Sequence, residues 1–124
     1  MENKRPKNLN LFTIRFPFPA MVSILHRVSG VVLFALMPVL TIGLYLSIQS
    51  EDSFLQVFAF FDTVFFKLIK CLMLWGIIHH LIAGTRHILL DLHFGMDLII
   101  ARLTSKIVLL LSFAISIFVG IWVW

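Results

Sequence analysis

Long uncharged runs of hydrophobic residues divide this sequence into three segments that suit membrane-spanning helices. The first run, 28–48, holds 21 residues without a charge, and the third, 107–124, holds 18. The second, 71–85, is shorter, but apolar residues extend it toward basic residues on both sides, whose long side chains can reach the interface. About 20 helical residues cross roughly 30 Å of hydrocarbon. The pattern therefore predicts an all-α membrane protein, a single membrane-anchor domain over residues 1–124, with spans at approximately 23–49, 66–91 and 105–124.

Prolines mark the start and the middle of the first span. Pro17 and Pro19 predict an extended lead that becomes helical from Ala20 onward. Pro38 lies within the uncharged run, and proline removes a helical hydrogen bond, so we expect a kink there.

Phenylalanines recur at helical spacing between the first two spans: Phe54, Phe58, Phe61 and Phe65. This spacing is typical of a helical approach to the second span that lies at the membrane interface or faces lipid. Packing of the four rings without any further role is the alternative.

The composition supports a membrane protein. Hydrophobic residues make up 60% of the chain and charged residues 13%, with a mean hydropathy of +1.04, which excludes an ordinary water-soluble domain. The net charge of +4 is modest, and in a membrane protein it reports orientation and lipid headgroups, so nucleic-acid binding is not indicated.

The single cysteine, Cys71, limits the chemistry that the chain can perform alone. It excludes an intrachain disulfide, a four-cysteine zinc site and an all-cysteine iron–sulfur cluster. The sequence also has no glycine-rich phosphate loop. We therefore do not expect the isolated polypeptide to oxidise a soluble metabolite.

The distribution of basic residues predicts the orientation. Eight basic residues precede or open the first span or surround the connection between the second and third spans: Lys4, Arg5, Lys7, Arg15, Arg27, Arg86, Arg102 and Lys106. The other connection has only Lys67 and Lys70. By the positive-inside rule, the amino terminus is expected in the cytoplasm and the carboxyl terminus outside.

The second span contains the candidate cofactor ligand. Gly76 and Gly84 lie four residues on either side of His80, so all three share one helix face, where glycines would leave room for a flat macrocycle. Neutral imidazole is a common axial ligand of haem iron. Close helix–helix contact through the small residues, with His80 hydrogen-bonded across it, is the alternative reading of the same spacing.

Other polar residues of this helix have less specific interpretations. His79 lies about 100° around the helix from His80 and is expected to bond a neighbouring helix. His87 and Arg86 are candidates for contacts with haem propionates or lipid phosphates. Together with Asp91, they also fit a solvated charge cluster at a helix end.

Polar residues gather at the start of the first span. Ser23 and Arg27 are four residues apart and share a face, and His26 lies on an adjoining one. A quinone needs hydrogen-bond donors for its two carbonyl oxygens and protons from an aqueous side, which these residues could supply. Anchoring to phospholipid fits the spacing equally.

Four motifs together resemble the cytochrome b membrane-anchor subunit of succinate dehydrogenase, or complex II. They cover most of the chain: Arg5-Pro6, residues 11–17, Ser23-Ile24-Leu25-His26-Arg27-Val28-Ser29-Gly30 and His80-x3-Gly84-x-Arg86-His87-x3-Asp91. The resemblance implies that Ser23 and Arg27 help to bind ubiquinone and that His80 ligates the iron of haem b. It places His26 and Arg27 near the haem propionates, which His87 could also contact. His79 departs from the family pattern.

The resemblance also implies partners and a place in metabolism. A second small anchor subunit would supply the other haem ligand, while a flavoprotein and an iron–sulfur subunit would deliver electrons from succinate in the tricarboxylic acid cycle. The chain would then be a multi-pass protein of the bacterial inner membrane that acts only as a subunit of succinate:quinone oxidoreductase.

Three other functions are alternatives to this one. A fumarate reductase anchor that uses menaquinol shares the chemistry, and a cofactor-free structural anchor would have the same spans. A small transporter or pore would need an ionisable group facing a pathway at mid-membrane. None of the three uncharged runs contains Asp or Glu, which disfavours a transporter.

Overall fold

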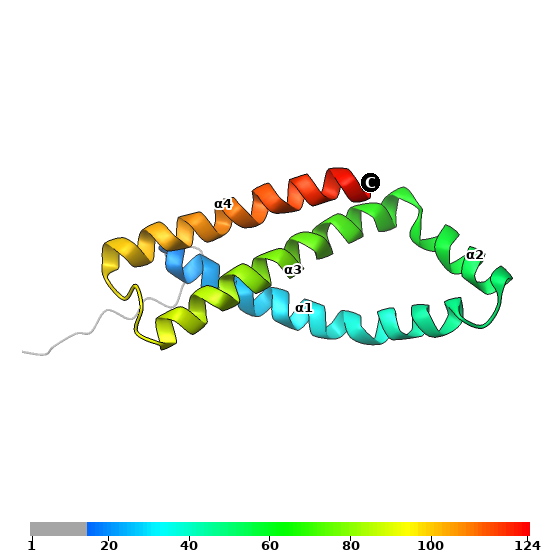
Figure 1. Cartoon of the computed structure of the whole chain (residues 1–124), viewed down its shortest axis with the longest axis horizontal. Helices are drawn as coiled ribbons and strands as arrows, with labels where there is room; N and C mark the ends of the chain where they lie inside the picture. The colour runs from blue at the N-terminus through cyan, green and yellow to red at the C-terminus, as the bar shows by residue number, and fades with distance from the viewer. Residues whose placement is uncertain (1–14) are drawn as a thin grey trace, which may run out of the picture.

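The computed structural model describes residues 15–124 and is helical throughout that range apart from short connections (Figure 1). Its four helices are α1 (Phe18–Ser47), α2 (Glu51–Phe61), α3 (Val64–Asp91) and α4 (Leu98–Val123). Three of them, α1, α3 and α4, are long and apolar enough to cross a membrane. The prediction of an all-α protein with three spans is confirmed. Lys4, Arg5, Lys7, Pro6 and residues 11–14, which the sequence analysis used, lie outside the described residues.

The three long helices run alternately up and down, and α3 contacts both α1 and α4 (Figure 1). The start of α1, the end of α3 and the start of α4 lie at one end of the bundle, and α2 lies at the other with the carboxyl terminus (Figure 1). We call these the histidine end and the α2 end. The described chain therefore begins and finishes at opposite ends, and which end faces the cytoplasm stays a prediction.

The first span begins earlier than the prolines predicted. Pro17 caps α1 in an extended conformation and Pro19 lies in the first helical turn, so the helix starts at Phe18 instead of Ala20. A first-turn proline is compatible with a helix because the N–H groups there have no intrahelical partner. The helix continues past Pro38 to Ser47, and the kink remains a prediction.

The connection that precedes the second span forms a separate helix, α2. The Ser50 hydroxyl accepts a hydrogen bond from the Ser53 N–H at 3.1 Å, and two acidic residues lie in the first turn, where they favour a helix N-terminus. Three of the four spaced phenylalanines fall on α2, and Phe65 falls on α3. The helical spacing was therefore correct, but it did not indicate the break between the two helices.

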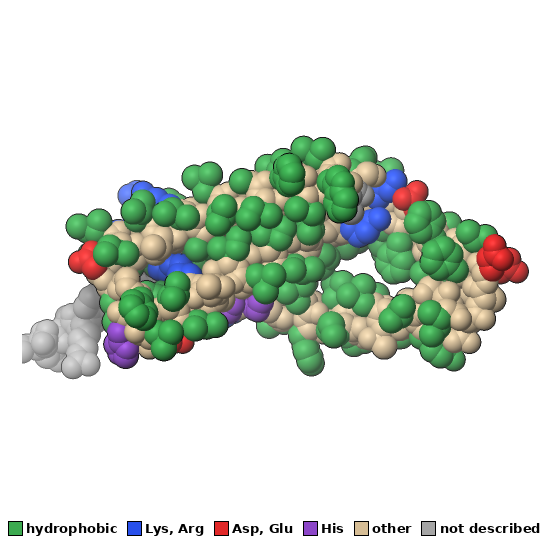
Figure 2. All heavy atoms as spheres, in the orientation of Figure 1, with side chains coloured by type: hydrophobic (Ala, Val, Ile, Leu, Met, Phe, Trp, Pro, Cys, Tyr) green, Lys and Arg blue, Asp and Glu red, His purple; other side chains and the backbone are tan. Residues whose placement is uncertain are grey.

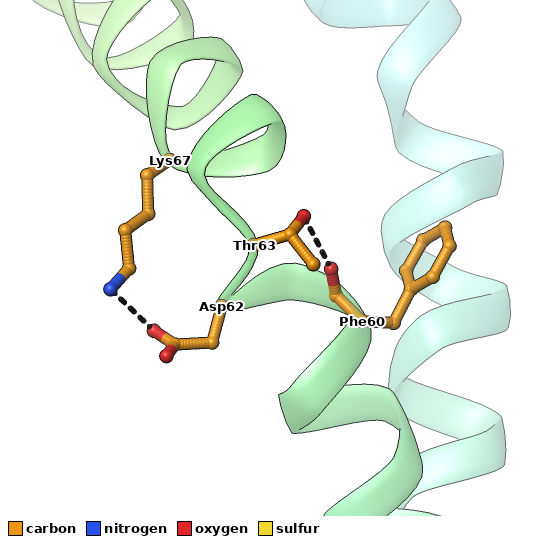
Figure 3. A network of polar contacts seen from close by, with 4 residues as sticks. All are labelled: Phe60, Asp62, Thr63 and Lys67. Carbon is orange, nitrogen blue, oxygen red and sulfur yellow. Dashed lines mark hydrogen bonds and ion pairs between the residues drawn. The ribbon is translucent and has the colours of Figure 1, made fainter.

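That break is a tight turn at Asp62 and Thr63 (Figure 3). The Lys67 ammonium lies 3.0 Å from the Asp62 carboxylate, and the Thr63 hydroxyl donates to the Phe60 carbonyl at 3.2 Å. Both contacts are at the surface, where an ion pair contributes about 0–1 kcal/mol. They direct the chain from α2 into α3 without burying any charge.

The helix that carries the third predicted span, α4, starts at Leu98, before the span bound near 105. The Asp97 carboxylate accepts hydrogen bonds from the N–H groups of Ile99 and Ile100, at 2.8 and 3.3 Å. This cap satisfies donors that otherwise lack a partner at a helix N-terminus. Asp97 therefore defines the start of the helix.

The interior between the helices is small and largely polar. Among residues 15–124, the buried hydrophobic side chains are Val22, Ala83 and Val108. The buried polar or charged ones are Ser29, His79, Arg86, Ser105, Ser112 and Ser116. Hydrophobic side chains are spread along the whole face of the bundle that Figure 2 shows. Such a surface suits lipid, where helices associate through close packing and hydrogen bonds and not through the hydrophobic effect.

Candidate functional site

The His80 imidazole lies at the contact between α3 and α1. Its Nδ1 is 3.1 Å from the His26 carbonyl oxygen and 3.1 Å from the Ser29 hydroxyl oxygen. Because a carbonyl only accepts hydrogen bonds, the first contact requires the proton on Nδ1, which leaves the lone pair on Nε2. Histidines that bind metals are oriented in this way, with one nitrogen donating to a carbonyl and the other free for the metal.

Gly30 allows the two helices to approach at this point. A Cβ atom at Gly30 would lie 2.9 Å from Cε1 of His80, closer than such contacts occur. The sequence analysis included Gly30 in a motif but missed this role. A glycine on an apolar helix is the signal that could have indicated a close crossing.

Three imidazoles gather at the histidine end. The His26 and His80 rings stack face to face, with centroids 4.2 Å apart and planes 10° apart. The His87 ring lies 5.1 Å from that of His26, tilted by 50°. In the sequence, His26 belongs to the first predicted span and His80 and His87 to the second, and the structure brings all three together.

The two glycines that flank His80 have different surroundings. A Cβ atom at Gly76 would meet nothing within 4 Å, whereas one at Gly84 would lie 3.2 Å from Nε2 of His26. The expectation that both glycines clear one surface for a macrocycle therefore fits Gly76 only. Gly84 makes room for the His26 ring, which the sequence of α3 alone did not indicate.

His79 faces the opposite neighbour, α4. Its side chain is 0% exposed, and its Nδ1 lies 3.3 Å from the Ser112 hydroxyl oxygen. That hydroxyl donates to the Leu109 carbonyl at 2.9 Å, so it accepts from His79, and Nδ1 carries the proton. The expected hydrogen bond to a neighbouring helix is confirmed. Ser112 is a partner that sequence analysis did not identify.

The remaining His79 nitrogen is enclosed. Nε2 is buried and has no hydrogen-bond partner within residues 15–124. The ring stacks on Trp75, with centroids 5.2 Å apart and planes 21° apart. A cofactor could reach this nitrogen only if the side chain left the interior.

Arg86 also turns toward α4. Its side chain is 7% exposed, its Nε donates to the Thr104 hydroxyl and a terminal nitrogen donates to the Ala101 carbonyl, both at 3.1 Å. Arg86 is thus already bonded to α4, and its contact with propionates or lipid phosphates stays a prediction. The expected charge cluster of Arg86, His87 and Asp91 is divided, because Asp91 is exposed and Arg86 is buried.

Ser23 and Arg27 share a face of α1, as their spacing predicted. Ser23 is partly buried and Arg27 is exposed. Within the described part of the chain, neither side chain has a hydrogen-bond partner. Both flank His26 in the sequence, so two polar groups able to donate hydrogen bonds lie beside the cluster of imidazoles.

A metal site built from several protein ligands is absent from the described range, residues 15–124, where no group of three or more His, Cys, Asp or Glu side chains could hold an ion. Haem iron requires fewer protein ligands, because the macrocycle supplies four and the protein supplies only the remaining ones. One imidazole with a free Nε2, as at His80, suits such a site.

Comparisons with known proteins agree with this site. Residues 1–119 match the family described as the succinate dehydrogenase/fumarate reductase transmembrane subunit. The chain is similar to proteins named succinate dehydrogenase cytochrome b556 subunit. That of Coxiella burnetii is 36% identical over 125 residues, with 100% of both chains covered. That of Rickettsia felis is 28% identical, with 92% of this chain and 89% of the relative covered.

A third such relative, from Paracoccus denitrificans, is 29% identical, with 82% of this chain and 78% of the relative covered. These matches confirm the resemblance drawn from the motifs, and with the three apolar helices they indicate a multi-pass membrane protein. The chain belongs to the succinate dehydrogenase/fumarate reductase transmembrane subunit family.

Proposed function

We propose that this chain is the haem b-binding membrane-anchor subunit of succinate dehydrogenase and helps to bind and reduce ubiquinone. The observation that carries the proposal is the setting of His80, whose Nδ1 donates to the His26 carbonyl at 3.1 Å and so leaves Nε2 available to iron. The printed name of the relatives, cytochrome b556 subunit, supports a b-type haem.

His80 is the proposed axial ligand. His79 is a poor competitor because its side chain is 0% exposed. His26 would not supply a second ligand beside His80, because the two rings stack face to face with centroids 4.2 Å apart. A second small anchor subunit, which the family implies, would supply the other ligand.

Other residues of the histidine end would hold the periphery of the cofactor. His26, Arg27 and His87 offer N–H donors, and donors of this kind form charge-assisted hydrogen bonds with propionates. Haem b, when bound, would supply one-electron redox chemistry. The chain's own contribution is to bind and orient it.

Ser23 and Arg27 are the proposed quinone donors. Their side chains have no hydrogen-bond partner within residues 15–124, so both are available to a carbonyl oxygen of ubiquinone. Their place near the start of α1 also lets protons arrive from water. Removing such a donor should weaken quinone binding by the free energy of one hydrogen bond.

The proposed partners follow from the family. A flavoprotein and an iron–sulfur subunit would deliver electrons from succinate, which agrees with a chain whose single cysteine cannot hold an all-cysteine iron–sulfur cluster. We propose that these dock at the histidine end on the cytoplasmic side of the bacterial inner membrane. The whole chain acts as one membrane-anchor domain.

The test is the absorbance spectrum of the purified complex with His80 replaced. The unaltered complex should show reduced b-type haem bands, and His80→Ala should lose the bands or shift them. His93→Asn is the matched control, because His93 is exposed in the loop before α4 and asparagine tolerates its φ of 65°. Bands that survive unchanged in the His80 variant would refute the proposed ligand.

A further inference from the structure

Two stripes of residues run side by side along the second half of α3. His79, Ala83 and Arg86 are its buried residues, and the two polar ones bond α4. One residue further on, His80, Gly84 and His87 form the stripe that contacts or adjoins His26 of α1. The two stripes are offset by one residue on the same helix. Any rotation of α3 about its axis therefore moves both of them.

The α4-facing stripe is anchored at two points. His79 bonds Ser112, and Arg86, seven residues later, bonds Thr104 and Ala101. The two contacts lie about two helical turns apart, so together they oppose rotation and sliding of α3 on α4. Hydrogen bonds serve this purpose in a membrane, where apolar side chains gain little by leaving lipid for a neighbouring helix.

Packing alone does not account for His79. A leucine or phenylalanine would fill the same space without a buried polar atom, whereas His79 keeps Nε2 buried without a partner in the described part of the chain. Such an atom costs free energy. What the imidazole provides in return is a directional contact with one hydroxyl, that of Ser112.

We propose that His79 is a positioning residue, which, through Ser112, fixes the rotation of α3 and thereby the plane of the His80 imidazole. This inference rests on the proposed role of His80 as a haem ligand. It gives His79 a function that needs neither iron nor quinone contact.

The test uses electron paramagnetic resonance of the oxidised complex. The low-field g value of a low-spin haem depends on the angle between the two axial imidazole planes, so it reports ring orientation and not only folding. Ser112→Ala removes the acceptor and should shift this g value, and Ser112→Thr, which keeps the hydroxyl, should restore it.

Ser116→Ala is the matched control. Ser116 is also buried on α4, but its hydroxyl donates to the Ser112 carbonyl, whereas His79 bonds the Ser112 hydroxyl. The low-field g value of the Ser116→Ala complex should equal that of the unaltered complex. A Ser112→Ala complex with the unaltered g value would overturn the positioning role.

A second variant tests the proposal if Ser112→Ala prevents assembly of the complex. If Ser112→Ala does not assemble, Ser112→Cys replaces the hydroxyl by a thiol, a weaker acceptor, and should give a smaller shift. No shift in that variant would overturn the proposal. Failure of the proposed function has a different signature: an unaltered complex without a low-spin haem signal, or a signal that survives loss of His80.

Discussion

The two ends of the bundle are constructed differently. At the histidine end, buried polar side chains join α3 to both neighbours, through Ser29 on α1 and through Thr104 and Ser112 on α4. Toward the α2 end, α1 and α3 diverge (Figure 1), and an apolar groove of about 640 Å³ opens between the helices, lined by residues such as Leu36, Phe66 and Trp124. Directional contacts are thus concentrated where we propose that the cofactor binds.

This difference has a physical reason. Apolar contacts between helices in lipid are replaceable by contacts with lipid chains, so they specify geometry weakly. Hydrogen bonds between buried groups are directional, and losing one partner leaves the other unsatisfied. Substitutions at the histidine end should therefore have larger effects than equivalent ones at the α2 end.

The largest effect among the variants that keep the ligand is expected at Gly30. A Cβ atom there would lie 2.9 Å from Cε1 of His80, so Gly30→Ala must displace the ring and should lower the haem content of the complex. Overpacking of this kind costs about 1–3 kcal/mol. Haem per complex, measured by absorbance, checks this.

Gly120→Ala is the control toward the α2 end, because a Cβ atom at Gly120 would meet nothing within 4 Å. It should retain full haem content. Equal haem content in the Gly30 and Gly120 variants would remove the distinction between the two ends.

The next effect is expected at Ser23. Ser23→Ala deletes one proposed donor to ubiquinone, and a hydrogen bond of about 1–3 kcal/mol corresponds to roughly 5- to 150-fold in binding or rate. Quinone reduction by the assembled complex should slow by that factor. Oxidation of succinate by a soluble artificial acceptor, and the haem spectrum, should stay unchanged, because that electron path does not reach the quinone. If quinone reduction is unchanged, Ser23 is not a donor to ubiquinone, and the alternative of anchoring to phospholipid applies.

The next effect is expected at Thr104, and it falls on the stability of the complex. Thr104→Val keeps the shape of the side chain but removes the acceptor of Arg86 Nε, which lies at 3.1 Å in a buried position. The unsatisfied donor should destabilise the complex by about 1–3 kcal/mol. Thermal denaturation of the detergent-solubilised complex measures the change, and a midpoint equal to that of the unaltered complex would contradict it.

The smallest effect is expected at Lys67. Lys67→Ala breaks the ion pair with Asp62 at the α2 end, and a surface pair of this kind contributes about 0–1 kcal/mol. Thermal denaturation should therefore differ little from that of the unaltered complex. If Lys67→Ala lowers the denaturation midpoint more than Thr104→Val does, the histidine end is not the end more sensitive to substitution.

The sequence predicted the spans because charge is excluded from hydrocarbon and the uncharged runs have the required length. It predicted a helical approach at Phe54 and Phe58 but not the break after it, because that break depends on the turn at Asp62 and Thr63. It also missed the early start of α4, although an aspartate ahead of an apolar run, Asp97, is a recognised cap signal.

The candidate site was only partly predictable. Four-residue spacing placed Ser23 with Arg27 on one helix face, but spacing says nothing about which residue of another helix lies opposite. Ser29 and His80 are 51 positions apart, and His79 and Ser112 are 33 apart. These pairings depend on how the helices cross. Serines recurring on one face of α4 were an available signal for a polar contact with α3.

The proposed ligand is tested most sharply by comparing His80 with its neighbour in the sequence, His79. The haem content of the complex should be lost in His80→Leu and retained in His79→Leu, because His80 has a free Nε2 at the contact with α1 and His79 is enclosed against α4. Haem lost from the His79 variant and retained by the His80 variant would contradict the account.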